Sequence, residues 1–271
     1  MRNRRTCLIC SKPNSYPLCK VCKTNPLFVE EGRQILAENK DLKTLRELYG
    51  RSLVEIQNLN NRIFWDKKLD KTQFLINQDG MTEERIQISS SWIPKESTKV
   101  LDIGAGYGFL EEIISKVDNL EIYANDISGI AIEKLKKRFT GEFKVESIYN
   151  LNYKKNYFDV VFALEVLEHI SPSKVFYALS NIRKILKKSG ILVVSVPVNE
   201  GLEQINDNPS GHVREYTVPL IPSELKLSGF KTLNIKILYA FEHFYSFKKI
   251  LSKFIKGRWK PNDVVVKAQK I

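Results

Sequence analysis

The sequence lacks any stretch of eighteen apolar residues, and it contains only three histidines. A helix needs about 20 apolar residues to cross a membrane, so we expect no transmembrane segment. No apolar run follows the basic residues of its start, MRNRRTC, so we expect no secretory signal and a cytoplasmic location. Internal repeats and low-complexity segments are also absent, so a repeat architecture is not expected. The scarcity of histidine leaves few candidates for a general base.

Charge is distributed unevenly along the chain. The net charge is +12 at pH 7, and residues 1–25 and 241–271 account for all of it. A basic surface favours a polyanionic partner such as RNA or an anionic membrane, although lysine-rich ends can also simply keep a protein in solution. No aromatic-rich RNA-binding motif accompanies the basic ends, so charge alone supports RNA.

All four cysteines fall within the first 22 residues, in two C-x-x-C pairs: Cys7 with Cys10, and Cys19 with Cys22. This spacing is typical of zinc knuckles, in which each pair contributes two thiolates to one tetrahedral ion. We therefore predict a zinc-knuckle-like segment over residues 1–25. The zinc would be structural, because so short a segment needs the ion to hold its fold. Four free thiols are the alternative.

The region 26–97 has the periodicity of helices. Leucine and isoleucine recur at helical intervals among charged residues over 28–92, with a weak interruption at Asn58–Asn61. A further helix is predicted over Thr82–Trp92, and Pro94 ends it. We predict that this region covers the domain that follows or forms a lid over its substrate.

From Lys99 onward, short apolar strands alternate with helices, which should begin near Gly108, Ser128 and Ser173. This alternation predicts an α/β fold over residues 98–271: a doubly wound, Rossmann-like sheet of seven strands with helices on both faces. The predicted strands are Val100–Ile103, Glu121–Asn125, Phe143–Ser147, Phe158–Ala163, Ile191–Val196 and, as a terminal hairpin, Thr232–Tyr239 and Val264–Ala268.

A loop with three glycines follows the first of these strands. Gly104, Gly106 and Gly108 lie between an apolar strand and an apolar-periodic segment, the context in which such a loop binds a ligand. The G-x-G-x-G spacing lacks the second x of the dinucleotide fingerprint, which argues against a dehydrogenase. No Gly-Lys-Ser/Thr follows, which argues against a P-loop. We therefore expect the glycine loop to contact a part of its ligand other than a nucleotide phosphate.

Asp126 directly follows the second predicted strand, twenty residues after Gly106. A carboxylate at that place can accept hydrogen bonds from both hydroxyls of a ribose. With VLDIGAGYG, YANDIS, FDVVFALEVLEHI and GILVVSVP in this order, residues 98–240 resemble the class I S-adenosylmethionine-dependent methyltransferases. The resemblance implies an enzyme that uses S-adenosylmethionine as its methyl donor.

The resemblance also implies which residues bind the cofactor. Asp126 would hold the ribose hydroxyls, and Asp102 would position the loop and approach the methionine amino group. Ser147 stands where the family often has an acidic residue, so the adenine contact would be weaker or made by backbone. The other residues would pass beside the cofactor, flank the adenine or face the methionine end: Gly104, Gly106, Gly108, Ile127, Ile148, Leu164 and Glu165.

Two histidines are the candidate catalytic residues. His169 lies in the run Glu165-x-x-Glu168-His169, and His212 lies in GHVREY. Ubiquinone-biosynthesis O-methyltransferases and small-RNA 2′-O-methyltransferases look similar at the E-x-x-E-H run, which contributes there to a metal site. By that resemblance Glu165, Glu168, His169 and His212 would ligate a divalent cation such as Mg²⁺, which lowers the pKa of a substrate hydroxyl. Alternatively, Glu168 and His169 cap or brace the following helix. Arg214 would pair with an acidic group of the substrate or with an internal carboxylate.

Residues 241–259, FEHFYSFKKILSKFIKGRW, place apolar side chains largely on one helical face and lysines largely elsewhere. Such a helix packs against its own domain, lies on an anionic membrane, or follows an RNA backbone. We favour packing against the domain, with peripheral membrane contact as the second interpretation.

The sequence thus predicts a methyltransferase that acts on a nucleophile, in the first place an oxygen, of a small-molecule, sugar-like or lipid-linked metabolite. One alternative is an RNA methyltransferase that binds RNA through the zinc knuckle and the basic ends. Another is a non-catalytic zinc-bearing binding protein. The complete set of cofactor residues Asp102, Gly104, Gly106 and Asp126 argues against the latter.

Overall fold

The computed structural model describes residues 58–71, 80–171, 174–200, 210–241, 244–255 and 259–271 of the 271-residue chain. The four cysteines of the predicted zinc knuckle and the predicted boundary near residue 25 lie outside these residues. Within the described ranges, no helix is long and apolar enough to span a membrane.

The described strands are β1 (Lys99–Ile103), β2 (Glu121–Asp126), β3 (Glu142–Val145), β4 (Phe158–Leu164), β5 (Leu186–Pro197), β6 (Phe230–Leu238) and β7 (Asp263–Lys270). The described helices are α4 (Arg62–Lys71), α5 (Gly80–Ser91), α6 (Glu111–Ile114), α7 (Gly129–Arg138), the 3₁₀ turn η1 (Leu167–His169), α8 (Val175–Ile185), α9 (Leu220–Leu227) and α10 (Tyr245–Phe254).

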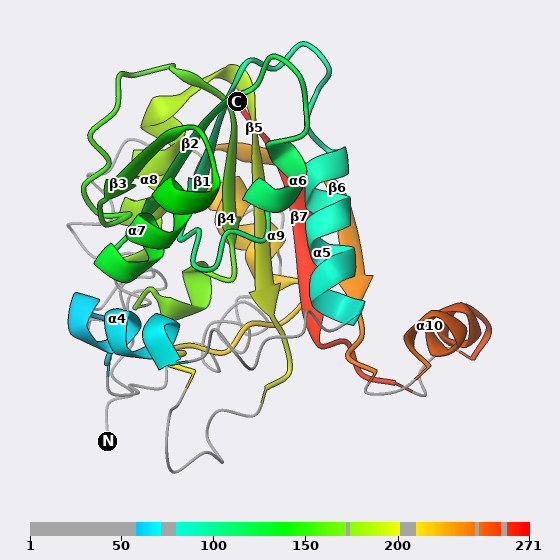
Figure 1. Ribbon diagram of the computed structural model, residues 1–271. Coiled ribbons are helices and arrows are strands. Elements are labelled where there is room, and N and C mark those ends of the chain that lie inside the picture. The colour runs from blue at the N-terminus through cyan, green and yellow to red at the C-terminus, as the bar shows by residue number, and fades with distance from the viewer. Residues whose placement is uncertain (1–57, 72–79, 172–173, 201–209, 242–243, 256–258) are drawn as a thin grey trace, which may run out of the picture.

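The seven strands form one mixed sheet in the order β3-β2-β1-β4-β5-β7-β6 (Figure 1). The first five strands are parallel, and β7 runs antiparallel between β5 and β6. The central strands are nearly continuous runs of valine, isoleucine and leucine because parallel strands are buried on both faces. This architecture confirms the predicted Rossmann-like sheet of seven strands, in which the last two strands form a hairpin.

All seven predicted strands are present, and the largest difference is at the start of β5. This strand begins at Leu186, five residues before the predicted Ile191. Its pairing with β4 is irregular there, since Phe158 pairs with Leu186 and Val160 with Ile191. The intervening residues include Ser189 at φ 60°, a turn conformation, and the polar residues Lys187, Lys188 and Ser189 precede the apolar run from which the strand was predicted.

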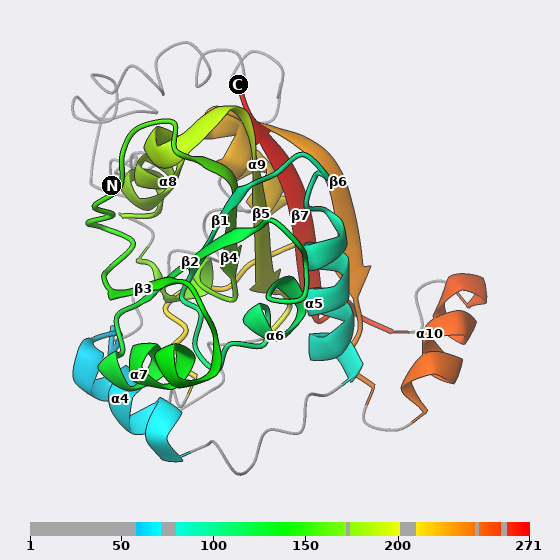
Figure 2. The same cartoon turned by 45° about the horizontal axis from the view of Figure 1, so that its top comes forward.

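Helices cover both faces of the sheet (Figure 2). On one face, α5, α6 and α7 bury residues such as Ile86, Ile114 and Leu135 against the strands. On the other face, α8 and α9 bury residues such as Leu179 and Leu225. Helix α9 was not predicted, and its sequence LIPSELKL contains a proline. That proline lies in the first turn, where the missing N–H has no helical partner to lose.

Helix α4 lies against the start of α7 at one end of the sheet (Figure 1). The interruption at Asn58–Asn61 marks its beginning, since Asn61 Oδ1 accepts a hydrogen bond from Phe64 N at 3.0 Å. Asp66 Oδ1 accepts hydrogen bonds from Ser128 Oγ at 2.6 Å and from Ile130 N at 3.3 Å. The carboxylate of α4 thus satisfies donors at the N-terminus of α7 and fixes α4 over the carboxyl edge of the sheet.

Helix α10 does not pack its apolar face against the domain, so the favoured prediction for residues 241–259 is wrong. Phe244, Phe247 and Phe254 are 79%, 65% and 79% exposed. The helix instead contacts α5 through its polar flank, where Tyr245 and Lys249 both reach the carboxylate of Glu84.

Candidate functional site

A cavity of about 460 Å³ opens at the carboxyl edge of the sheet. Its wall comes from the residues that follow β1, β2, β3 and β4, and from α4 with the segment before it. Ligands of open α/β sheets bind at this edge, where the strand order reverses beside β1. The residues of the wall are Asn58, Asn60, Asn61, Arg62, Trp65, Leu69, Ile103, Gly104, Gly106, Asp126, Ile127, Glu146, Ser147, Ile148, Tyr149, Glu165, Val166, His169, Ile170 and Lys174.

The glycine loop reaches this cavity with two of its three glycines. Gly104 has φ 74°, and a Cβ added there would lie 2.7 Å from Val166 Cγ2. Gly106 has φ 52°, and a Cβ there would meet nothing closer than 3.9 Å. Gly108 is not part of the wall, and its bare face lies against Leu135 instead. Gly104 and Gly106 therefore leave a strip of backbone open to a ligand, whereas Gly108 allows the loop to pack on α7.

Replacing the two cavity glycines by alanine, one at a time, should lower the unfolding free energy by different amounts. Gly104→Ala combines an unfavourable backbone conformation with a clash, so we expect a loss of about 1–3 kcal/mol in unfolding free energy. Gly106→Ala meets no neighbour, so its cost should stay near 1 kcal/mol while its methyl group occupies the cavity. Urea unfolding and calorimetry with S-adenosylhomocysteine check both variants. Equal losses of stability would contradict this assignment.

Asp126 ties the glycine loop to the next helix. Its Oδ2 accepts a hydrogen bond from Gly106 N at 3.0 Å, and its Oδ1 accepts one from Ser128 N at 2.7 Å. Burial raises the pKa of Asp126, and the two backbone donors oppose that shift. The side chain lies in the cavity wall at the end of β2, as a ribose-binding carboxylate requires.

Asp102 lies at the end of β1 but is not part of the wall. It is buried beside Glu111 of α6. Burial raises the pKa of Asp102 well above its usual range, and burial raises the pKa of Glu111 to about 7. The contact of Asp102 with the amino group of the cofactor's methionine stays a prediction.

The residues after β3 form the wall next to Asp126. Ser147 and Ile148 line the cavity, and Ile127 joins them from the end of β2. Glu146, which was not predicted as a site residue, also lines the cavity one residue before Ser147. An acidic residue directly beside the position that should carry one was the signal that could have found it. Leu164 is not part of the wall.

Glu165 has a left-handed backbone conformation with φ 56°, which is uncommon outside glycine. Ser195 Oγ donates a hydrogen bond to Glu165 Oε1 at 2.7 Å. Arg85 of α5 lies 3.0 Å from Glu165 Oε2 and 2.5 Å from Asp263 Oδ2. The carboxylate at the end of β4 is therefore held by a serine of β5 and an arginine of the covering helix.

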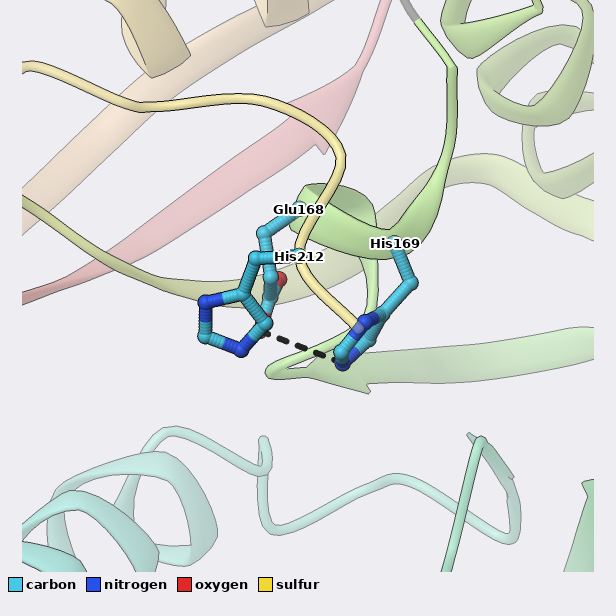
Figure 3. Close-up of side chains that lie close together, drawn as sticks. All are labelled: Glu168, His169 and His212. Atoms are coloured by element: carbon cyan, nitrogen blue, oxygen red, sulfur yellow. Dashed lines mark ion pairs between the residues drawn. The ribbon is translucent and has the colours of Figure 1, made fainter. Parts of the chain in front are cut away.

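Glu168, His169 and His212 place one potential ligand atom each within 4.8 Å of one another (Figure 3). Glu168 and His169 come from η1, and His212 comes from the loop before α9. Both carboxylate oxygens of Glu168 are buried without a hydrogen-bond partner. Glu165, the fourth predicted ligand, is not part of this group, because its carboxylate faces Arg85 and Ser195.

The two histidines are in different surroundings. His169 lies in the cavity wall, and its Nδ1 is 3.1 Å from the carbonyl oxygen of Gly211. Burial and the neighbouring His212 lower the pKa of His169 to about 3, so its ring is neutral at neutral pH. His212 is not part of the wall, and its Nδ1 lies 2.7 Å from Glu200 Oε1. The ring of Trp65 stands edge-on to His169 with centroids 4.8 Å apart.

The structure shows no capping of the following helix by Glu168 or His169, whereas bracing of that helix stays a prediction. Helix α8 has no side-chain hydrogen bond at its N-cap, and His169 contacts the loop at Gly211 instead. Arg214 pairs with the internal carboxylate of Glu224, which also accepts a hydrogen bond from Tyr216 Oη at 2.9 Å. The GHVREY segment is therefore fixed by a buried ion pair within the domain.

Comparisons with known proteins agree with this geometry. A family model described as a methyltransferase domain matches residues 101–194. The chain is 30% identical over 172 residues to the uncharacterized protein MJ0638 of Methanocaldococcus jannaschii, which covers 62% of this chain and 71% of that protein. It is 32% identical over 113 residues to the ubiquinone biosynthesis O-methyltransferase of Pelagibacter ubique, which covers 40% of this chain. The match spans 46% of that enzyme, less than half of its length.

A solved structure shows the same fold. The 1,6-didemethyltoxoflavin-N1-methyltransferase of Burkholderia thailandensis, determined with bound S-adenosylhomocysteine, superposes with a TM-score of 0.59 at 16% sequence identity. The superposition covers 77% of this chain and 86% of that one.

Proposed function

The chain belongs to the class I S-adenosylmethionine-dependent methyltransferases, and we propose that it methylates an oxygen nucleophile on a small-molecule, sugar-like or lipid-linked metabolite. The observation that carries the proposal is one continuous cavity that has Gly104, Gly106 and Asp126 in one wall and His169 in another.

The residues of the cavity fit the cofactor. When bound, S-adenosylmethionine supplies a methyl group on a sulfonium, ready for in-line displacement. Gly104 and Gly106 expose the backbone of the loop, and a side chain at Gly106 would project into open space. Asp126 would accept the ribose hydroxyls, while Ile127 and Ile148 would flank the adenine. Glu146 adds an acidic side chain beside Ser147, which lacks one.

At the other wall, His169 is suited to bind a metal ion. If Nδ1 donates to the Gly211 carbonyl, Nε2 of the neutral ring carries the lone pair that can ligate a cation. A pKa of about 3 makes this ring a weak base, so it would not remove a proton from the substrate by itself. Activation of the acceptor would then come from alignment and from a further group that Nε2 helps to hold.

We propose that this further group is a divalent cation held by Glu168, His169 and His212. The ligand atoms are close together, and a cation would satisfy both unpaired oxygens of Glu168. Neutral imidazole is the form that binds metal. Two imidazoles and one carboxylate favour Mn²⁺ or Zn²⁺ over the Mg²⁺ predicted from the sequence. When bound, the ion would supply a Lewis acid for the substrate hydroxyl.

Removing one ligand should weaken metal binding strongly. We expect Glu168→Gln and His212→Ala each to lower the affinity for Mn²⁺ by about tenfold or more, as measured by electron paramagnetic resonance of free Mn²⁺. Mn²⁺ is the preferred probe because thiolates bind it weakly, so the four cysteines should not compete. Glu133→Gln, an exposed residue of α7, is the control. A wild type without an Mn²⁺ site would refute the metal.

The acceptor class is tested by methyl transfer from labelled S-adenosylmethionine. The full chain is incubated with hydroxylated small molecules, lipid-linked hydroxyl compounds, amines and RNA, and the products are treated with mild base. A base-stable product on a hydroxyl substrate supports the proposal. Transfer to RNA alone would favour the RNA methyltransferase. Cofactor binding without transfer to any class would favour a non-catalytic binding protein.

A further inference from the structure

Helix α10 presents an apolar face to the outside of the molecule. Phe247, Ile250 and Phe254 lie three and four residues apart, so they share one face, and Phe244 precedes them at the N-cap. Their exposed fractions are 65%, 58%, 79% and, for Phe244, 79%. Single exposed apolar residues are common, but a contiguous group on one element marks a binding surface.

Polar contacts hold the helix in this orientation. Tyr245 Oη donates a hydrogen bond to Glu84 Oε2 at 2.7 Å, and Lys249 Nζ lies 2.6 Å from Glu84 Oε1. The ring of Tyr245 packs on Gly80, where a Cβ would lie 2.5 Å from Tyr245 Cγ. Because α5 holds the polar flank, the apolar flank faces away from the domain. Figure 1 shows α10 standing apart from the sheet, beyond α5 and β6.

The charge around this face identifies its partner. Residues 241–271 contain eight lysines and arginines but only two acidic residues. An apolar face with lysines beside it is typical of helices that lie in the interface of an anionic membrane. We propose that α10 docks the protein on an anionic lipid surface. Phe244, Phe247, Ile250 and Phe254 insert between the headgroups, and the lysines contact lipid phosphates.

Other occupants fit this surface less well. A ten-residue helix is about 15 Å long, whereas a stable protein interface buries about 800 Å² on each partner. Four side chains on one short helix do not supply that area, which argues against a second copy of the chain. RNA phosphates bind cations, whereas the exposed face consists of phenylalanine and isoleucine.

The docking surface and the cavity belong to the same edge of the sheet. Strands β5 and β6 both run antiparallel to β7, so they are parallel to each other. Helix α10 follows the carboxyl end of β6, and the cavity lies at the carboxyl ends of β1 to β4. Docking therefore brings this edge toward the lipid. If the proposed function holds, the substrate is accordingly one that resides in the membrane.

Vesicle co-sedimentation of the full chain tests the docking without any catalysis. The probes are vesicles of phosphatidylcholine alone and of phosphatidylcholine with phosphatidylglycerol. We expect binding to the anionic vesicles and a loss of about tenfold or more in Phe247→Ser/Phe254→Ser. Val117→Ser/Tyr177→Ser, which removes two exposed apolar side chains elsewhere, should bind like the wild type. Urea unfolding confirms that each variant is folded.

Three results would overturn the proposal. The first is a wild type that stays in the supernatant with both kinds of vesicle. The second is a phenylalanine variant that binds as tightly as the wild type, which would reduce the interaction to charge alone. The third is a wild-type dimer, seen by light scattering, that the phenylalanine substitutions dissociate, which would make the face a contact between copies. Binding of S-adenosylhomocysteine, measured separately, distinguishes each of these results from a failure of the proposed function.

Discussion

Replacing Asp126 by alanine is expected to weaken the binding of S-adenosylhomocysteine by about tenfold to a thousandfold. A hydrogen bond to a charged group contributes about 1.5–3 kcal/mol, and about 1.4 kcal/mol corresponds to a factor of ten in affinity. The substitution removes the proposed acceptor for the ribose hydroxyls. It also removes the acceptor that holds Gly106 N at 3.0 Å, so the glycine loop loses its connection to β2.

Calorimetry with S-adenosylhomocysteine measures this effect, with Asp118→Ala as a control that removes an exposed aspartate before the amino end of β2, away from the cavity. Asp126→Asn separates the two contributions, because the amide oxygen can still accept from Gly106 N but carries no charge. An Asp126→Ala protein that remains folded and binds as tightly as the wild type would refute the cofactor site.

Replacing Arg85 by methionine should destabilise the protein by about 3–5 kcal/mol at pH 9, the usual cost of removing one partner from a buried ion pair. Arg85 is 8% exposed, and Asp263, 178 residues later in the chain, is fully buried. Methionine fills part of the space but leaves a buried carboxylate without its cation. Arg138→Met, which removes a partly exposed pair with Glu112, should cost less than about 1 kcal/mol.

The loss should depend on pH. Burial raises the pKa of Asp263 to about 8, while Arg85 opposes this shift, so without Arg85 the pKa rises further. A carboxyl whose pKa is raised on folding favours the folded state below the pKa of the unfolded chain, about 3.9. That contribution declines as the pH rises through the folded-state pKa. In Arg85→Met this contribution keeps declining to higher pH. The difference in unfolding free energy between the wild type and the variant therefore widens above about pH 8.

Urea unfolding at a series of pH values measures this dependence. Arg85→Met/Asp263→Asn, which removes the buried charge as well, should recover much of the stability at high pH. If the double variant is as unstable as Arg85→Met alone, the cause is lost packing rather than an unpaired carboxylate.

The sheet could be predicted from the sequence because each strand is a local pattern. Runs such as FDVVFAL and GILVVSVP are apolar on both faces and bounded by polar or glycine residues, so their positions required no knowledge of tertiary contacts. The same local patterns identify three residues of the cavity: Gly104, Gly106 and Asp126. Each of them follows or ends a strand, and parallel strands bring their carboxyl ends to one edge of the sheet.

The remaining parts depend on contacts between distant residues. Trp65 reaches the ring of His169 from a helix more than a hundred residues earlier, and no local pattern indicates that proximity. The carboxylate of Glu165 faces Arg85 and Ser195, which come from distant parts of the chain, and the spacing E-x-x-E-H does not reveal these partners. The outward orientation of α10 was missed because amphipathic periodicity identifies an apolar face but not the direction in which it points.

The position of β7 has a consequence for synthesis on the ribosome. Strand β7, residues 263–270, lies between β5 and β6 and pairs with both. When the first 238 residues have been made, β6 has no partner strand and β5 has one open edge. The sheet is therefore complete only after residue 270 has left the exit tunnel. Until Asp263 has also emerged, Arg85 cannot form its ion pair with that residue. Chains stalled before that point carry unpaired strand edges, which makes them natural clients for chaperones.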